Sequence, residues 1–345
     1  MNRVKLISFT VPCYNSEAYM RKCIDSLLVG KDEVEIIIVD DGSTDNTGII
    51  ADEYVEKYPT ICRVCHKANG GHGSGVNKGI ELSTGLYFKV VDSDDYLEEN
   101  ALLELLDTLR DHVNNKEEAD LYITNFIYDK QYDSTQYVSE YKKNFPVRRF
   151  FEWKEAKALK LWKMLLMHSL LYKTEKLRES GLVLPEHTFY VDNIFAYVPL
   201  PYMKKIYYLD VNLYMYYIGR PGQSVTIDNV VKRYQEQIRV MNIMLEVYSY
   251  NDICKMDKPL KKNMLHILYA IMNNTIFFTT AKNSSERRKL YYDMWNNLKV
   301  RDKNMYNYLK HHTSILIFNI ASWNLKGALS IMGYKFLCKY VKLGV

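Results

Sequence analysis

The chain has 345 residues, of which 48% are hydrophobic and 25% charged, and its formal net charge is +5. This composition is typical of a globular protein with a substantial core, and the charge is too small for the length to indicate nucleic-acid binding. No stretch reaches 18 clean apolar residues, so the sequence predicts no membrane-spanning helix. We expect one large domain or two modest ones.

The start of the chain and the cysteines bear on its location. Residues 1–5 lead straight into a predicted strand without a signal-peptide cleavage pattern. The six cysteines are scattered, which is typical of a reducing compartment, so we expect a cytoplasmic protein. Cys62 and Cys65 form a CxxC pair, but a structural zinc site needs a second pair of ligands nearby, so an ordinary pair in a strand is favoured.

Strands and helices alternate over the first 128 residues. Apolar and β-branched runs predict strands, and amphipathic stretches between them predict helices. The expected strands cover 6–12, 35–39, 62–66, 87–91 and 119–128, and the expected helices cover 16–28, 48–58, 75–82 and 97–112. This alternation predicts an α/β fold with a Rossmann-like, mostly parallel sheet flanked by helices.

The pattern changes further along the chain. Residues 151–171 are predicted as a helix, and 206–218 as a tyrosine-rich extended segment. Beyond residue 228 the predicted elements are all helices, at 230–248, 260–278, 285–298 and 326–342. We therefore expect an α/β domain over 1–228 and a helical C-terminal region over 229–345.

Three polar clusters follow predicted strands. They are PCYNSE at 12–17, DDGSTD at 40–45 and DSDD at 92–95. Ligands of parallel α/β sheets collect beyond the carboxyl ends of the strands, so we expect these clusters to meet at one edge of the sheet.

The third cluster places Asp92, Asp94 and Asp95 directly after a buried strand. Crowded carboxylates repel one another and are costly to bury without a partner. A calcium loop does not fit, because Tyr96 and Leu97 occupy its fifth and sixth positions. The Asp92-x-Asp94 pair at a strand end suits Mg²⁺ or Mn²⁺ shared with phosphates.

A glycine-rich loop, NGGHGSGVNKG, occupies residues 69–79. It is not a dinucleotide fingerprint, because Val76 stands in place of the third glycine and the loop does not follow the first strand. It is not a Walker loop, because Lys78 is followed by Gly79 and not by a hydroxyl residue. The loop either lets a backbone approach a ligand closely or forms a flexible turn before a helix.

Four stretches resemble, in order, the motifs of family 2 glycosyltransferases: TVPCYNSEAYMRKCIDSLL, EIIIVDDGSTDNT, NGGHGSGVNKGIELSTGLYFKVVDSDDYL and the later FYVDN. The resemblance is strong over residues 4–128, looser to about 228 and almost absent beyond. It implies the GT-A fold, a nucleotide-sugar donor and inversion at the anomeric carbon. It also implies a donor-binding half at 1–128 and an acceptor half at 129–228.

The resemblance implies roles for single residues. Those that would line the nucleotide-sugar site are Pro12, Tyr14, Asn15, Glu17, Asp40, Asp41, Gly73, Asn77, Asp92 and Ser93. Within this set, Asp41 with Asp40 beside it would hold the uracil and ribose region through charge-assisted hydrogen bonds. Asp94 and Asp92 would hold Mn²⁺ or Mg²⁺, with Asp94 the better candidate for direct contact.

One position departs from the family pattern. Many relatives carry an arginine before the asparagine of the glycine loop, where this chain has Val76. A cationic contact to the diphosphate is then missing or supplied by another residue. His72, Lys78 and Arg220 are the candidates, and the sequence does not choose among them.

Asp192 is the catalytic base that the resemblance implies. The family pattern has an acid–Asp pair, and this chain has Val191 in place of the first acid. Glu186 is a rival base, and a helix N-cap is the structural alternative for Asp192. As the base, Asp192 would accept the proton of an acceptor hydroxyl that attacks the anomeric carbon, while charge on the leaving diphosphate is stabilised by the metal.

Residues 150–228 would build the acceptor wall. Its candidates are Trp153, Trp162, His168, His187, Tyr190 and the tyrosine-rich stretch 214–217. The two tryptophans lie in a strongly apolar stretch, so core packing is favoured for them. The segment YIGRPGQSVT at 217–226 resembles a loop that closes the donor pocket in many relatives, and a surface hairpin is the alternative.

The last predicted helix is amphipathic. Its lysines Lys335, Lys339 and Lys342 share one narrow face, and another face holds Leu329, Met332, Phe336, Leu337 and Tyr340. The helix either lies on a membrane, giving peripheral contact with the inner face of the plasma membrane, or packs onto the domain or a second subunit. Packing or homo-oligomerisation is favoured.

The resemblance therefore implies a glycosyltransferase that uses a UDP-sugar and a glycan or lipid-linked glycan acceptor in bacterial surface polysaccharide synthesis. A catalytically inactive relative that scaffolds a glycan-synthesis complex is the alternative, weakly favoured by Val76 and Val191 and opposed by Asp41, Asp94 and Asp192. A nucleotidyltransferase would need a glycine- and Lys/Arg-rich loop after its first strand, and PCYNSE is not one.

Overall fold

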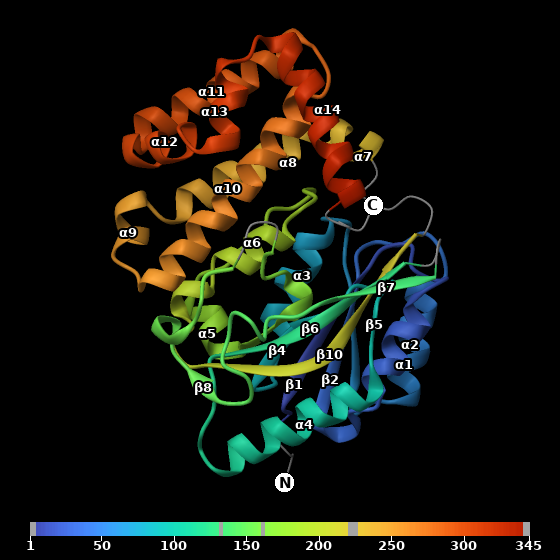
Figure 1. Cartoon of the computed structure of the whole chain (residues 1–345). Coiled ribbons are helices and arrows are strands. Elements are labelled where there is room, and N and C mark those ends of the chain that lie inside the picture. Colours follow the sequence, from blue (N-terminus) through green and yellow to red (C-terminus); the bar gives the residue numbers. More distant parts are fainter. Residues whose placement is uncertain (1–4, 131–133, 160–162, 220–226, 341–345) are drawn as a thin grey trace. The chain divides into compact units, whose positions relative to one another are not determined.

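The computed structural model describes residues 5–130, 134–159, 163–219 and 227–340 (Figure 1). The chain packs into two compact units. The first comprises Met1–Lys157 and Leu165–Ile218, and the second comprises Ala158–Met164 and Gly219–Val345.

The first unit is built on a ten-stranded sheet. Its strands are β1 (Ile7–Cys13), β2 (Val34–Asp40), β3 (Cys62–His66), β4 (Tyr87–Val90), β5 (Tyr96–Leu97), β6 (Leu121–Lys130), β7 (Thr135–Ser139), β8 (Phe150–Phe151), β9 (Leu170–Lys173) and β10 (Ile206–Ile218). The main path runs β3-β2-β1-β4-β9-β6-β10-β5, with β7 on β6 and β8 on β10. The expected strands are all present.

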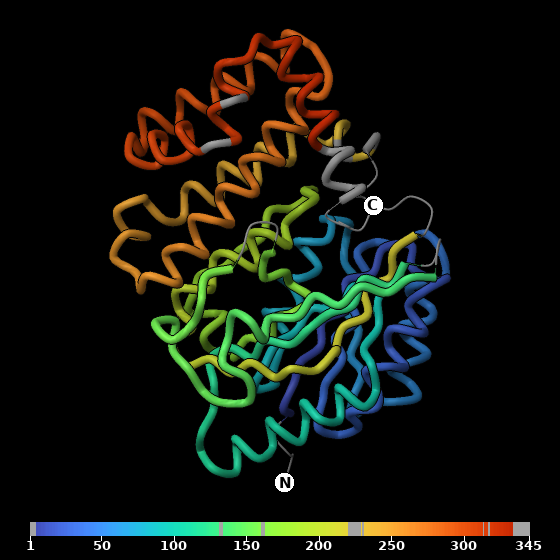
Figure 2. The backbone as a smooth tube through the Cα atoms, in the orientation of Figure 1, coloured from blue at the N-terminus to red at the C-terminus, as the bar shows by residue number. Residues whose placement is uncertain are grey.

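The sheet is mixed. Its β3-β2-β1-β4 part is parallel, and so is the β6–β10 pair, whereas β5, β7, β8 and β9 pair antiparallel with their neighbours. Strands β6 and β10 lie side by side although their paired residues are 85 to 88 positions apart in the sequence (Figure 2). The parallel part contains the three strands that end at the polar clusters.

Helices flank this sheet. They are α1 (Met20–Leu28), α2 (Thr47–Lys57), α3 (His72–Leu82), α4 (Glu99–Asn114), α5 (Thr174–Glu179) and α6 (Asp192–Tyr197), with short 3-10 turns at Lys31–Glu33, Trp153–Glu155, Met167–Ser169 and Leu200–Tyr202. Every residue of β1 and β2 is buried, which explains why their sequences, ISFTVPC and VEIIIVD, are mostly apolar and β-branched.

The helix predicted over 151–171 is wrong. The described part of this stretch holds the end of β8, two 3-10 turns and the start of β9. Trp153 is buried in the first unit and its indole N–H donates to the Met203 carbonyl at 2.8 Å, whereas the Leu159 N–H donates to Asn263 of the second unit. The apolar side chains of this stretch are thus divided between two cores, so they do not form the single apolar face of one helix.

The second unit is helical in its described part. Its helices are α7 (Ile227–Lys232), α8 (Tyr234–Val247), α9 (Tyr250–Cys254), α10 (Lys258–Thr280), α11 (Ser285–Arg301), α12 (Lys303–Lys310), α13 (Thr313–Ile320) and α14 (Trp323–Tyr340). Helices α8, α10, α11 and α14 match predicted ones within a few residues, and α9, α12 and α13 were not predicted. Trp162 and residues 220–226 lie outside the described residues.

Candidate active site

The three polar clusters meet at the carboxyl ends of β1, β2 and β4. The Asp41 N–H donates to the Cys13 carbonyl at 2.9 Å, which joins the second cluster to the first. The hydroxyl oxygens of Ser16 and Ser93 lie 2.7 Å apart, which joins the first cluster to the third. Parallel pairing in register brings these ends together, although they are up to 80 residues apart in the sequence.

The loop after β1 is fastened to the loop after β2. Asn15, in the left-handed backbone region at φ 49°, accepts the Thr44 N–H on its side-chain oxygen at 2.9 Å. Glu17 accepts the backbone and side-chain N–H groups of Asn46 at 3.0 and 2.7 Å. Pro12 is buried at the end of β1, and Tyr14 is 55% exposed. Asn15 and Glu17 therefore shape this edge, while the Tyr14 ring remains accessible to a ligand.

Asp40 and Asp41 are both buried and both hydrogen-bonded. Asp40 lies 2.9 Å from the His66 ring and accepts the Ser43 N–H at 3.0 Å. Burial acts to raise the pKa of Asp40, but these two hydrogen bonds outweigh it and the pKa is lowered. Asp40 is therefore a fixed anion at the end of β2.

Asp41 organises the glycine-rich loop. Its carboxylate accepts the N–H groups of Gly70 and Gly71 at 3.0 and 2.7 Å and lies 2.6 Å from the Lys67 ammonium. Gly71 has φ +83°, which favours glycine, and an added Cβ there would lie 3.2 Å from the His187 nitrogen. The sequence analysis did not identify Lys67, because the only feature that marks it is a basic side chain directly after β3.

Hydrogen bonds and a close backbone approach hold helix α3 to the segment before α6, and we call these contacts the latch. The Asn77 side chain exchanges two hydrogen bonds with the Leu184 backbone, at 2.8 and 2.9 Å. A Cβ on Gly73 would lie 2.7 Å from the Pro185 carbonyl oxygen, so this position needs glycine. The Ser74 hydroxyl donates to Glu186 at 2.7 Å. Asn77 and Gly73 thus have a positioning role, and Glu186, the rival base, is held at this latch.

His72, the first residue of α3, is paired with Asp92. Its Nε2 lies 2.7 Å from Asp92 Oδ1, and 34% of its side chain is exposed. Burial acts to lower the pKa of His72, but the charge and hydrogen bond of Asp92, reinforced by Asp192 and Asp94, raise it. His72 therefore holds its proton more tightly than a free imidazole does.

Asp192 lies within electrostatic reach of this pair although it is 100 residues away in the sequence. It begins α6, and the N-cap position is Val191, so the N-cap alternative for Asp192 is wrong. Burial raises the pKa of Asp192 to about 6, with His72 opposing the shift and Asp92 reinforcing it. A carboxyl group with this pKa is suited to accept a proton near neutral pH.

Asp92, Asp95 and His168 form a cluster that could hold a metal ion, with one ligand atom of each lying within 4.8 Å of the others. The Nδ1 atom of His168 is buried without a hydrogen-bond partner, and burial lowers the pKa of His168 to about 4. Carboxylates and a neutral imidazole are suitable ligands for a divalent metal. His168, expected in the acceptor wall, is thus buried beside the aspartates, and Asp94, the expected ligand, is not in this cluster.

Tyr214 supports the aspartate loop from β10. Its hydroxyl donates to Asp95 at 2.6 Å and accepts the Asp92 N–H at 3.1 Å. The second Asp95 oxygen accepts the Tyr217 N–H at 2.8 Å. Burial, reinforced by Asp94 and Asp92, raises the pKa of Asp95 well above its usual value. The tyrosine-rich stretch therefore positions the aspartates, which its sequence did not reveal.

The structure shows the surroundings of Val76, which stands where many relatives carry an arginine. Val76 is completely buried in α3. Lys78 is paired with Glu81 at 2.6 Å on the surface of the helix. Arg220 lies outside the described residues. Of the two candidates that the structure describes, His72 lies at the aspartate cluster and Lys78 does not.

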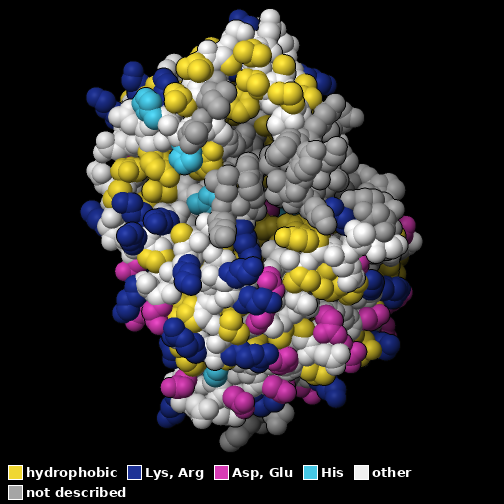
Figure 3. All heavy atoms as spheres, in the orientation of Figure 1, with side chains coloured by type: hydrophobic (Ala, Val, Ile, Leu, Met, Phe, Trp, Pro, Cys, Tyr) yellow, Lys and Arg dark blue, Asp and Glu magenta, His cyan; other side chains and the backbone are white. Residues whose placement is uncertain are grey.

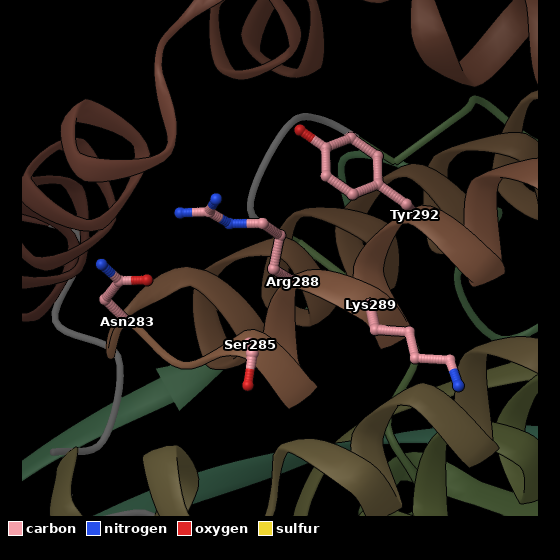
Figure 4. A pocket seen from close by; sticks show the side chains of 5 residues that line it. All are labelled: Asn283, Ser285, Arg288, Lys289 and Tyr292. Carbon is pink, nitrogen blue, oxygen red and sulfur yellow. The ribbon is translucent and has the colours of Figure 1, made fainter.

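A separate cavity of about 430 Å³ lies in the second unit. Its lining consists of Asn283, Ser285, Arg288, Lys289 and Tyr292, at the start of α11 and just before it (Figure 4). None of these residues is a carboxylate, so the cavity offers neither the expected metal ligands nor the expected base.

Known proteins resemble the chain in sequence. Residues 8–165 match the family model "Glycosyl transferase family 2". The chain is 31% identical to the putative glycosyltransferase EpsH of Bacillus subtilis over 67% of its own length and 64% of that protein. It is 38% identical to the hyaluronan synthase of Pasteurella multocida over 36% of its length and 13% of that protein. The matches to the first three curated relatives span 27%, 39% and 64% of those proteins.

A solved structure shares the fold. The TarS protein of S. aureus (residues 1–349), in complex with UDP-GlcNAc, superposes with a TM-score of 0.65 at 19% identity, covering 95% of this chain and 92% of that one. Among the described residues, no helix has the length and apolar character needed to cross a membrane. The motifs, the sheet and these matches agree: the chain belongs to glycosyltransferase family 2 and has the GT-A fold.

Proposed function

We propose that the protein is an inverting glycosyltransferase that works in the cytoplasm and moves a sugar from a UDP-sugar to a glycan or lipid-linked glycan in bacterial surface polysaccharide synthesis. The main support is the grouping of His72, Asp92 and Asp192, which puts a carboxyl group with a pKa of about 6 beside a histidine–carboxylate pair. Displacement at a sugar bound to a diphosphate needs such a base and a charged site for the leaving group.

The comparisons support the choice of donor and pathway class. The TarS structure holds UDP-GlcNAc, and one relative is a hyaluronan synthase, which indicates polysaccharide products among related proteins. In this proposal the clusters at 12–17 and 40–45 bind the nucleotide, and residues 129–228 face the acceptor. Asp192 accepts the proton of the attacking hydroxyl, and the bond from the anomeric carbon to the diphosphate breaks as the new glycosidic bond forms.

A divalent cation belongs to this proposal. When bound, Mg²⁺ or Mn²⁺ would supply positive charge that stabilises the leaving diphosphate. Asp92 and Asp94 would hold the ion, and Asp95 with His168 offers a second set of ligands around Asp92. The donor atoms fit such an ion, because carboxylate oxygens are the ligands that Mg²⁺ and Mn²⁺ prefer.

We further infer that His72 takes the place of the missing family arginine. The pKa of His72 is raised by Asp92, the residue stands at the N-terminal end of α3, and its ring nitrogen already reaches the aspartate cluster. Helix N-termini favour anions through their free N–H groups, so a phosphate near His72 gains from both.

A thermal-shift screen of nucleotide sugars with and without Mn²⁺ tests the proposal, because a ligand that binds only the folded protein raises its melting temperature. We expect UDP-sugars with Mn²⁺ to give the largest rise, and chelator or Asp94→Asn to remove most of it. Donor turnover should then release UDP when a glycan acceptor is added. Binding without turnover across acceptors would favour the inactive scaffold, and no response to any nucleotide sugar would contradict the proposal.

A further inference from the structure

The sequence of the second unit is strongly basic. Residues 219–345 contain 20 lysines and arginines but eight aspartates and glutamates, a net charge of +12, whereas residues 1–218 carry −7. Asp302 is the last acidic residue of the chain, and six lysines follow it. The positive charge is therefore concentrated in the C-terminal region and is not a property of the whole protein.

The helices at this end leave apolar side chains exposed. On α13, Ile315 is completely buried, whereas Leu316 and Ile320, one turn apart on another face, are 40% and 79% exposed. On α14, Leu325 and Met332, two turns apart, are 51% and 64% exposed. Figure 3 shows apolar side chains gathered over the upper helices of the second unit, where Figure 1 labels α13 and α14.

The opposite face of α14 is already packed within its unit. Trp323 is buried against Tyr291, and the Ser330 and Thr280 hydroxyl oxygens lie 2.6 Å apart. Lys326 is buried and donates to the Ala321 carbonyl at 2.7 Å, which fixes the joint between α13 and α14. Since Leu325 and Met332 lie about half a turn away from these residues, the exposed apolar face is held outward by a packed inner face.

The net charge of this region distinguishes among the partners that could cover such a face. A second copy of the chain would bring two regions of net charge +12 together, which is unfavourable. A soluble polyanion would satisfy the charge but would leave the apolar side chains in water. An anionic lipid surface satisfies both, because lysines near the headgroups attract it and apolar side chains enter the acyl boundary.

We propose that the exposed apolar side chains of α13 and α14, namely Leu316, Ile320, Leu325 and Met332, dock on an anionic membrane surface with the help of the net positive charge of the C-terminal region. This inference does not depend on the proposed glycosyl transfer. It departs from the sequence-based preference for packing or oligomerisation, because Met332 of the expected apolar face is exposed while Trp323 and Ser330 are buried.

Vesicle flotation of the full chain tests this surface. The wild type should float with vesicles of phosphatidylcholine mixed with phosphatidylglycerol and not with pure phosphatidylcholine, and salt should weaken the binding. The double variant Ile320→Asp/Met332→Asp should bind the anionic vesicles at least about tenfold more weakly, since it removes apolar contacts and adds negative charge. Ile320→Gln/Met332→Gln should give a smaller loss.

A matched control variant introduces the same two negative charges on the first unit. Leu103→Asp/Ile49→Asp replaces exposed apolar residues of the first unit, and it should bind vesicles nearly as the wild type does. Circular dichroism of each variant confirms folding. Absence of vesicle binding in the wild type, or equal loss in the control, would overturn the proposal. If the wild type is a dimer and only the Ile320→Asp/Met332→Asp variant dissociates, the partner is a second copy of the chain and the proposal is overturned. If the wild type binds a soluble polyanion but no vesicles, the partner is a polyanion and the proposal is likewise overturned.

Discussion

Asp192 acquires the properties of a base from its surroundings. An exposed aspartate near its usual pKa of 3.8 would be a weak proton acceptor, but burial raises the pKa to about 6. Glu186, the rival base, is exposed and accepts the Ser74 hydroxyl. At the scale of single residues, the two carboxylates therefore differ in environment more than in chemistry.

Replacement of Asp192 tests its role as the base. Asp192→Asn keeps the shape and removes the basicity, so sugar transfer should fall roughly 10²–10⁴-fold while UDP affinity stays near that of the wild type. Transfer assays and calorimetry with UDP measure the two quantities. Glu186→Gln is the matched control and should keep most of the activity. If Glu186→Gln abolishes transfer and Asp192→Asn does not, the assignment is reversed.

The pH dependence has a sign that follows from the same shift. A base must be ionised to act, so the transfer rate should rise with pH through about 6 and then level off. A cation bound at Asp92 would lower the pKa of Asp192 and move this limb to lower pH. A rate profile that is flat through this region would contradict the assignment.

The contribution of Asp192 to the free energy of unfolding should fall as the pH rises, whereas the transfer rate should rise. Folding raises the pKa of this carboxyl, so its contribution to stability is fully present below the unfolded value and is lost as the pH rises through about 6. At neutral pH, Asp192→Asn should therefore melt at or above the wild-type temperature. A clearly lower melting temperature would mean that the charged form is structurally required.

His72 is predicted to contact the diphosphate of the donor. His72→Ala should weaken UDP binding roughly tenfold while leaving the affinity for uridine, which lacks phosphates, nearly unchanged. Calorimetry with both ligands separates this role from a loss of folding, which would weaken both. Lys78→Ala, which removes the surface cation paired with Glu81, serves as the control. Equal losses for UDP and uridine in His72→Ala would contradict the role.

At the scale of elements, the latch between α3 and the segment before α6 sets the geometry of the site. Asn77 bonds both backbone groups of Leu184, and Gly73 allows α3 to approach Pro185 closely. These contacts link the helix that carries His72 to the segment that leads to Asp192. The latch therefore joins the proposed donor half of the site to the proposed base.

Removal of the latch should cost both stability and activity. Asn77→Ala leaves the Leu184 N–H and carbonyl without partners, which should destabilise the first unit by about 1–3 kcal/mol. We also expect transfer to fall more than UDP affinity does, because Asp192 loses its position. Chemical unfolding and transfer assays measure these effects. Unchanged stability would show that the segment is held by other contacts.

At the scale of the whole molecule, the chain has two compact units with separate cores. The first carries the whole candidate site, and the second carries the basic helices. Leu268, completely buried in α10, belongs to the second core. The two units therefore offer separate targets for stability measurements.

Calorimetry should detect this division. Leu268→Ala should destabilise the second unit by about 2–5 kcal/mol while UDP with Mn²⁺ still stabilises the first. Leu121→Ala, at a completely buried position of β6, is the matched substitution in the first core and should reduce the response to UDP. If Leu268→Ala removes UDP binding as fully as Leu121→Ala does, the two units unfold as one.

The sequence by itself determined the α/β alternation, the three polar clusters and their meeting at one sheet edge, because strand periodicity and turn chemistry are local properties. It also indicated Asp192 and the family. The tertiary structure decided what depends on distant neighbours. Burial raises the pKa of Asp192, the contact of His72 with Asp92 places one candidate cation at the aspartates, and His168 is buried close to Asp92 and Asp95. The failed helix at 151–171 has the same cause: apolar spacing records that side chains are buried but not which core buries them.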